Sequence, residues 1–164
     1  MKKAFFSTLF LLLAFLFTAN SQILVPVKWS FDSKKINNEE FELILKVDID
    51  KGWHIYGTGT LKEGPIPTSF KFKPSKEYEL IGNLVKPEEV ALYDEVFKMD
   101  ISYFSDHASF KQRVKMKSDK PFQVSIEIEH QACNDRSCIA PEITEYAFDL
   151  PGVENSGKEG NKED

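Results

Sequence analysis

Polar and apolar residues alternate with a period of two along several stretches of this chain. In the clearest stretch every second residue is apolar: Phe41, Leu43, Leu45, Val47 and Ile49. This alternation is typical of a β-strand that packs one face against a hydrophobic core and turns the other face to solvent. The same alternation predicts four further strands, over residues 23–31, 110–116, 122–128 and 146–150.

Turn-forming residues separate these predicted strands at short intervals, because Gly, Pro and Asn favour chain reversals. They lie at Pro26, Asn37–Asn38, Lys51–Gly52, residues 57–67, Gly82–Asn83 and residues 118–121. A short helix fits the pattern of residues 87–92. Many short strands with so little helix predict an all-β protein, an immunoglobulin-like antiparallel β-sandwich. We expect its core to include Phe41, Leu43, Leu45, Val47, Val114, Val124, Ile126 and Phe148.

The first 21 residues have the pattern of an export signal. A basic start precedes an apolar run over residues 4–17, and Ala19 and Ser21 are small residues at the spacing of a cleavage site. The run is shorter than the roughly 20 residues that span a bilayer. We therefore expect three parts: a signal peptide over residues 1–21, one domain over 22–150 and a disordered polar tail over 151–164.

The charge of the chain argues against two classes of partner. Its net charge of −5 becomes −7 when Lys2 and Lys3 leave with the signal peptide. An acidic protein is poorly suited to nucleic acid and to anionic membrane surfaces. We expect no nucleic-acid partner, no membrane insertion after signal cleavage and, because no second large apolar face is predicted, a monomer.

The chain has two cysteines, Cys133 and Cys138, separated by the four turn-forming residues Asn134–Ser137. The two cysteines are therefore expected to face each other across a hairpin loop. The alternation of the preceding strand, continued to Cys133, places that side chain on the outer, polar face, whereas a structural sandwich disulfide normally points inward. A bulge before Cys133 would reverse this expectation.

Three kinds of site fit this pair: a redox couple, a structural clip and a metal site. A disulfide that closes so small a loop stabilises a fold by only about 2 kcal/mol, which favours the redox couple over the clip. For a metal site, His130 lies three residues before Cys133, but zinc needs four ligands, and His54 and His107 are remote in sequence. We expect neither a metal nor another cofactor.

Three segments, in this order along the chain, carry a resemblance to a known family: Gly52–Tyr56 (GWHIY), Tyr93–Phe97 (YDEVF) and Cys133–Glu142 (CNDRSCIAPE). They resemble a strand, a cap loop and the C-x(4 or 5)-C-x-x-P-E segment of the N-terminal periplasmic domain of the DsbD thiol-disulfide interchange proteins. From the residues alone, Trp53, His54 and Tyr56 are expected to serve packing rather than chemistry.

The resemblance implies an immunoglobulin-like domain with a redox-active disulfide on a hairpin. By position, Cys138 matches the cysteine that forms mixed disulfides, and Cys133 matches the one that resolves them. The cap over the cysteines corresponds to Tyr93, Asp94, Glu95 and Phe97. Its acidic residues would act as local proton donors and acceptors, and its aromatic residues would shield the sulfurs from small oxidants.

The resemblance also implies a place for the protein and a set of partners. Family members work in the periplasm, take electrons from a thioredoxin-like domain and pass them on for disulfide isomerisation or cytochrome c maturation. No transmembrane or thioredoxin segment follows Leu150, so we expect thioredoxin-like periplasmic proteins and a transmembrane thiol reductase acting in trans. The protein would then be a component of a protein-disulfide reductase system. The alternative is a secreted immunoglobulin-like binding or assembly module with a purely structural disulfide.

Overall fold

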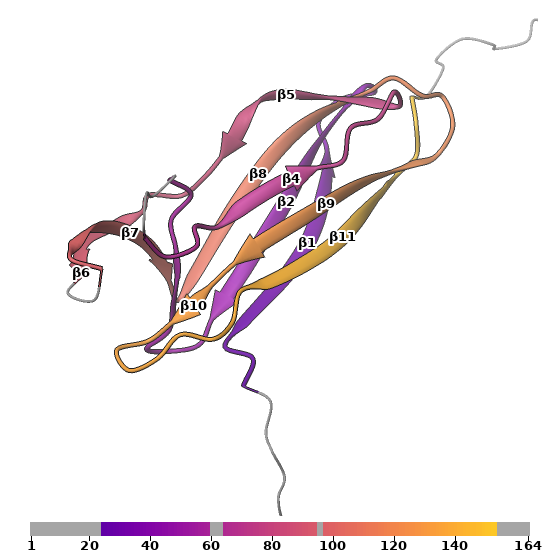
Figure 1. Cartoon of the computed structure of the whole chain (residues 1–164). Helices are drawn as coiled ribbons and strands as arrows, with labels where there is room; N and C mark the ends of the chain where they lie inside the picture. Colours follow the sequence, from indigo (N-terminus) through magenta and orange to yellow (C-terminus); the bar gives the residue numbers. More distant parts are fainter. Residues whose placement is uncertain (1–23, 60–63, 95–96, 154–164) are drawn as a thin grey trace, which may run out of the picture.

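The computed structural model describes residues 24–59, 64–94 and 97–153, and within these ranges its regular structure consists of β-strands (Figure 1). All strand pairs are antiparallel. The predicted all-β, immunoglobulin-like sandwich is therefore confirmed. In the described part of the chain, no helix is long and apolar enough to cross a membrane.

One layer of the sandwich is a sheet with the strand order β1-β2-β8-β5. Its strands are β1 (Val27–Lys35), β2 (Glu40–Ile49), β8 (His107–Met116) and β5 (Tyr78–Val85). In β2 and β8, buried positions recur at every second residue, as the alternation in the sequence predicts. This sheet therefore presents one continuous apolar face to the core.

The second layer is a sheet with the strand order β11-β9-β4. Its strands are β11 (Glu142–Leu150), β9 (Phe122–His130) and β4 (Ser69–Phe72). Aromatic rings from both layers meet in the core, where Trp29 of β1 lies 6.0 Å from the rings of both Phe70 and Phe110. All eight predicted core residues are confirmed, since each is at most 8% exposed.

A third, smaller sheet has the strand order β10-β3-β7-β6 and lies at one end of the sandwich (Figure 1). Its strands are β10 (Ala132–Cys133), β3 (His54–Tyr56), β7 (Met99–Ser105) and β6 (Val90–Asp94). This sheet brings together the GWHIY segment, part of the YDEVF segment and the first cysteine.

Two local predictions were wrong. The helix expected over residues 87–92 does not form, because the chain enters strand β6 at Val90 and pairs there with β7. The turn expected at Gly82–Asn83 lies instead inside β5, where Gly82 has a φ of 66° and the register against β8 shifts. Glycine accepts such a left-handed conformation without a Cβ clash, so the strand continues through an irregularity rather than reversing.

Candidate functional site

Cys133 and Cys138 form a disulfide across a tight hairpin loop. Their Cα atoms are 4.0 Å apart, and their backbones form an isolated antiparallel bridge. Asn134 closes the loop, since its side-chain Oδ1 accepts hydrogen bonds of 2.9 Å from the backbone N–H groups of Arg136 and Ser137. Asn is a turn former for this reason. The predicted hairpin is therefore confirmed.

The prediction that Cys133 faces outward was wrong. Strand β9 ends at His130, and after Gln131 the chain enters a different sheet, where Ala132 pairs with Ile55 and Cys133 with His54. Because the chain changes sheets, the alternation of β9 does not continue to the cysteine. Cys133 is only 2% exposed, whereas Cys138 on the other side of the hairpin is exposed.

The buried sulfur belongs to a small apolar cluster outside the main core. This sulfur cluster consists of Tyr56, Ile101 and Cys133, with Phe97 and Met99 packed against it. The ring of Phe97 meets the ring of Tyr56 edge to face at a centroid distance of 6.4 Å. Phe97 is half-buried and thus lies at the outer side of the cluster.

Phe97 is held in place by the end of strand β6. Its backbone N–H donates a 2.9 Å hydrogen bond to Oδ1 of Asp94, the last residue of β6. The predicted cap residues therefore behave differently: Asp94 and Phe97 lie together at the sulfur cluster, whereas Tyr93 is 52% exposed and lies outside it. Glu95 falls outside the described residues.

Two side chains of the GWHIY segment line the site. Tyr56 is 2% exposed, so its predicted packing role is confirmed, and burial together with the nearby Asp94 raises the pKa of its phenol. His54 lies opposite Cys133 in the register, with its ring 5.3 Å from that of Tyr56. Burial lowers the pKa of His54, an effect that Asp94 and Asp135 partly offset. His54 therefore favours its neutral form at the side of the disulfide.

His130 lies away from the solvent, within the sandwich. It is 1% exposed, and its ring meets that of Trp29 at 5.8 Å. Burial lowers its pKa, and the carboxylate of Glu142, whose Oε2 lies 3.8 Å from Nε2, partly offsets this. Across the described ranges, no group of three or more His, Cys, Asp or Glu side chains is placed to hold a metal ion.

The arrangement of the two sulfurs suits thiol-disulfide exchange. An exchange reaction requires a sulfur that an outside sulfur can reach in line, together with a second cysteine close enough to attack it intramolecularly. Cys138 is exposed, and the Cα atom of Cys133 lies 4.0 Å from that of Cys138 across the hairpin. The partly buried Phe97 packs against the cluster that contains Cys133.

Known proteins are similar to this chain in family and in fold. The family model described as "Thiol:disulfide interchange protein DsbD, N-terminal" matches residues 21–150. The N-terminal periplasmic domain of ScsB from Proteus mirabilis is similar in structure, with a TM-score of 0.53 and 15% identity over 79% of this chain and 49% of that one. The reduced N-terminal domain of DsbD from Neisseria meningitidis gives a TM-score of 0.49 and 16% identity over 76% and 86%. A search of curated protein sequences found no match.

Proposed function

Because this chain belongs to the family of the N-terminal domain of the thiol:disulfide interchange protein DsbD, we propose that it carries electrons in the periplasm by exchange at Cys133 and Cys138. The single observation that supports this most is the unequal exposure of the two bonded cysteine residues. An exposed sulfur can meet a partner, and a buried one beside it can resolve the product.

The proposed reaction moves two electrons per cycle. In the reduced protein, the Cys138 thiolate attacks a disulfide of an oxidised partner, whose S–S bond breaks to release one partner thiolate. The Cys133 thiolate then attacks Cys138, breaks the mixed disulfide and releases the second partner thiolate. The partner takes up two protons as its thiols form, and the Cys133–Cys138 disulfide returns. Reduction by a dithiol donor is the reverse sequence.

The cap would control which sulfurs reach the pair. Phe97 would cover the cluster until a partner docks, and Asp94 would exchange protons with the thiols, a role that the family resemblance extends to Glu95. We assign Tyr93, which is exposed on β6, to the outer edge of the cap, where a partner would touch it first. The donor would be a thioredoxin-like protein reduced by a transmembrane thiol reductase. Periplasmic thiol oxidoreductases, including those of cytochrome c maturation, would be the acceptors.

The inward position of Cys133 also favours a second candidate, a secreted binding or assembly module with a structural disulfide. A structural disulfide in a sandwich normally points inward, as this sulfur does. Against it, the hairpin loop is so small that the bond contributes only about 2 kcal/mol. A structural disulfide also does not require an exposed cysteine, whereas Cys138 is exposed.

The reduction potential separates the two candidates. We expect a reduction potential among those of interchange proteins. We also expect the oxidised protein to exchange with a reduced thioredoxin-like donor, and the loss of free thiols from that donor measures this exchange. A potential well below about −300 mV, with no exchange, would reject the proposed function and support the structural module. We expect the protein to act as a monomer, which sedimentation tests.

A further inference from the structure

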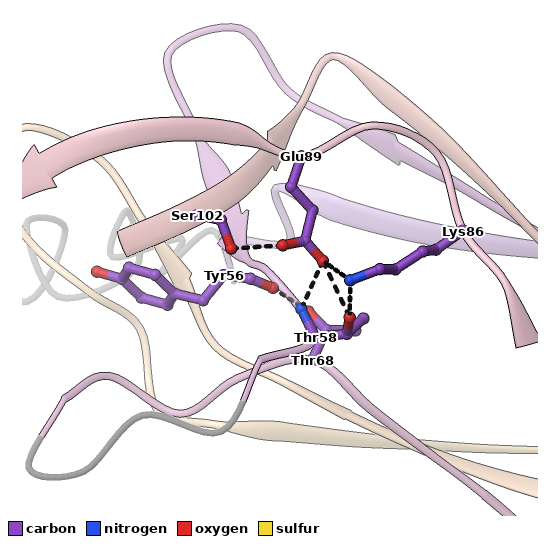
Figure 2. A network of polar contacts seen from close by, with 6 residues as sticks. All are labelled: Tyr56, Thr58, Thr68, Lys86, Glu89 and Ser102. Atoms are coloured by element: carbon purple, nitrogen blue, oxygen red, sulfur yellow. Dashed lines mark hydrogen bonds and ion pairs between the residues drawn. The ribbon is translucent and has the colours of Figure 1, made fainter. Parts of the chain in front are cut away.

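A single carboxylate, that of Glu89, lies at the centre of a polar network close to Tyr56 (Figure 2). Glu89 accepts hydrogen bonds from Thr58, through its backbone N–H at 3.1 Å and its hydroxyl at 2.9 Å, from Lys86 Nζ at 2.6 Å and from the Ser102 hydroxyl at 2.5 Å. Its side chain is only 16% exposed. Burial alone would raise the pKa of this carboxyl, but the bonds from Lys86, Ser102 and Thr58 lower it to about 2.

Glu89 and its three partners, Thr58, Lys86 and Ser102, lie in or next to four different strands. Glu89 immediately precedes β6, the strand that carries the cap, while Ser102 belongs to β7. Thr58 follows the end of β3, and Lys86 follows the end of β5. Hydrogen bonds to a charged acceptor are stronger than those between neutral groups, so one carboxylate fastens the start of β6 to the segments around it.

The residue between Tyr56 and Thr58 must be a glycine for this carboxylate to approach. A Cβ on Gly57 would overlap the Ser102 hydroxyl and lie 2.7 Å from Glu89 Oε2. The backbone N–H of Gly57 donates to the Ser102 carbonyl at 2.6 Å. On its other side, the carbonyl of Tyr56 accepts a 2.6 Å hydrogen bond from the Thr68 hydroxyl. Both hydrogen bonds are made by the single peptide unit that joins Tyr56 to Gly57, so this unit is held from two sides.

Tyr56 is the link between this network and the chemistry. Its ring packs with Cys133 and Phe97 in the sulfur cluster. Tyr56 is also only two residues before Thr58, whose backbone N–H donates to Glu89. Strand β6, which begins at the residue after Glu89, ends at Asp94, the acceptor for the Phe97 backbone. The carboxylate thus lies where two segments that lead to the sulfur cluster meet, one through Tyr56 and one through β6 to Asp94.

We propose that Glu89 is a positioning residue for the disulfide, because its carboxylate fixes Tyr56 and the start of β6 and so sets how tightly Phe97 covers the sulfur cluster. This proposal rests on the proposed function, because it assumes that the position of Phe97 controls the rate of thiol-disulfide exchange. Loss of the carboxylate loosens the cap, and reagents too small to need docking reach the sulfurs sooner.

The test measures the rate at which dithiothreitol reduces the native disulfide of Glu89→Gln, under conditions far from unfolding. Dithiothreitol is oxidised to its cyclic disulfide while Cys133 and Cys138 become thiols. We expect reduction about tenfold faster than in the unsubstituted protein, since one lost charge-assisted hydrogen bond changes an equilibrium constant by roughly that factor. Glu127→Gln is the matched control, because it removes the same charge from an ion pair with Lys71 on another sheet. Its rate should be unchanged.

A second measurement separates positioning from a general loss of stability. If Glu89 acts through the cap, adding Phe97→Ala to Glu89→Gln should give little further acceleration, because the cover is already displaced. The proposal would be overturned if the acceleration in the double variant equalled the product of the two single accelerations. It would also be overturned if Glu89→Gln were reduced at the same rate as the unsubstituted protein. Should Glu89→Gln fail to fold, Ser102→Ala removes one bond of the network while keeping the charge, and the same outcomes decide. Because the reagent is a small thiol, failure to exchange with a thioredoxin-like protein would reject the proposed function alone.

Discussion

Cys133 and Cys138 are bonded to each other but meet different surroundings: Cys133 lies against Tyr56 at 2% exposure, and Cys138 faces solvent. A disulfide is attacked at the sulfur that an incoming thiolate can reach, and a thiol hidden behind it reacts only within the same molecule. The difference in exposure therefore gives each sulfur a separate expected role.

Single cysteine variants should trap a partner unequally. Cys133→Ser keeps the accessible Cys138 and removes the resolving thiol, so a mixed disulfide with a thioredoxin-like protein should accumulate. Cys138→Ser should trap little, because the remaining sulfur is buried. Non-reducing electrophoresis and mass spectrometry measure both products. The opposite asymmetry would show that the two roles are exchanged.

Phe97→Ala should open the sulfur cluster without unfolding the sandwich. We expect faster reduction of the oxidised pair by dithiothreitol and faster oxidation of the reduced pair, because the ring no longer limits access. Since Phe97 is only half-buried, the loss of stability should be smaller than the roughly 3–5 kcal/mol of a fully buried Phe.

The control for this experiment is Phe110→Ala. Phe110 is 0% exposed and lies in the main core, so its removal should cost roughly 3–5 kcal/mol and leave the native-state reduction rate unchanged. Thermal unfolding and reduction rate are measured on both variants. A Phe97→Ala protein that is strongly destabilised, with an unaltered native-state rate, would count against the cap.

Reduction of the disulfide should lower the free energy of unfolding by only about 2 kcal/mol, because the bond closes a very short loop. Denaturant titrations of the oxidised protein and of a Cys133→Ala, Cys138→Ala double variant give this difference. A loss of about 5 kcal/mol, at the top of the range for native disulfides, would instead point to a structural bond.

The buried His130 should make the protein less stable in mild acid. Burial lowers its pKa in the folded state, so below the ordinary value of about 6.5 the unfolded chain binds a proton that the folded chain does not. The free energy of unfolding should therefore fall as the pH drops through this value, until the folded-state pKa is reached. His130→Phe should reduce the slope, as measured by denaturant titrations between about pH 8 and pH 5.

His54, whose pKa burial also lowers, contributes with the same sign, so part of the slope should remain in His130→Phe. A slope that is identical in the unsubstituted protein and in His130→Phe would contradict the assignment to His130.

Strands β2, β8 and β9 could be predicted from sequence because each meets the core at every second residue along its length. Leu43, Leu45 and Val47 alternate with outward residues, and their burial follows directly from the period of two. The short strands of the third sheet give no such signal. Strands β3 and β10 have three and two residues, too few for a period to be visible, and they are strands because β7 and the hairpin provide partners.

The candidate site was predictable from sequence where its structure depends on neighbouring residues in the chain. The turn residues after Cys133 predicted the hairpin, but the change of sheet at Gln131 depends on pairing with β3, far away in sequence, so the orientation of Cys133 was missed. Glu89 was missed for the same reason. Its partners Thr58 and Ser102 lie 31 and 13 residues away, and the sequence marks the position with nothing more than an acidic residue in a charged loop.

Three strands of the third sheet, β3, β6 and β10, are much shorter than β2 and β8 of the sandwich, and this has a consequence for hydrogen exchange. Short strands with few long-range partners open locally at a lower free energy than the global unfolding of the protein. Amide protons in β3, β6 and β10 should therefore exchange in a group of their own, earlier than those of β2 and β8. The protein would expose its hidden sulfur by melting a small cooperative unit while the sandwich stays folded.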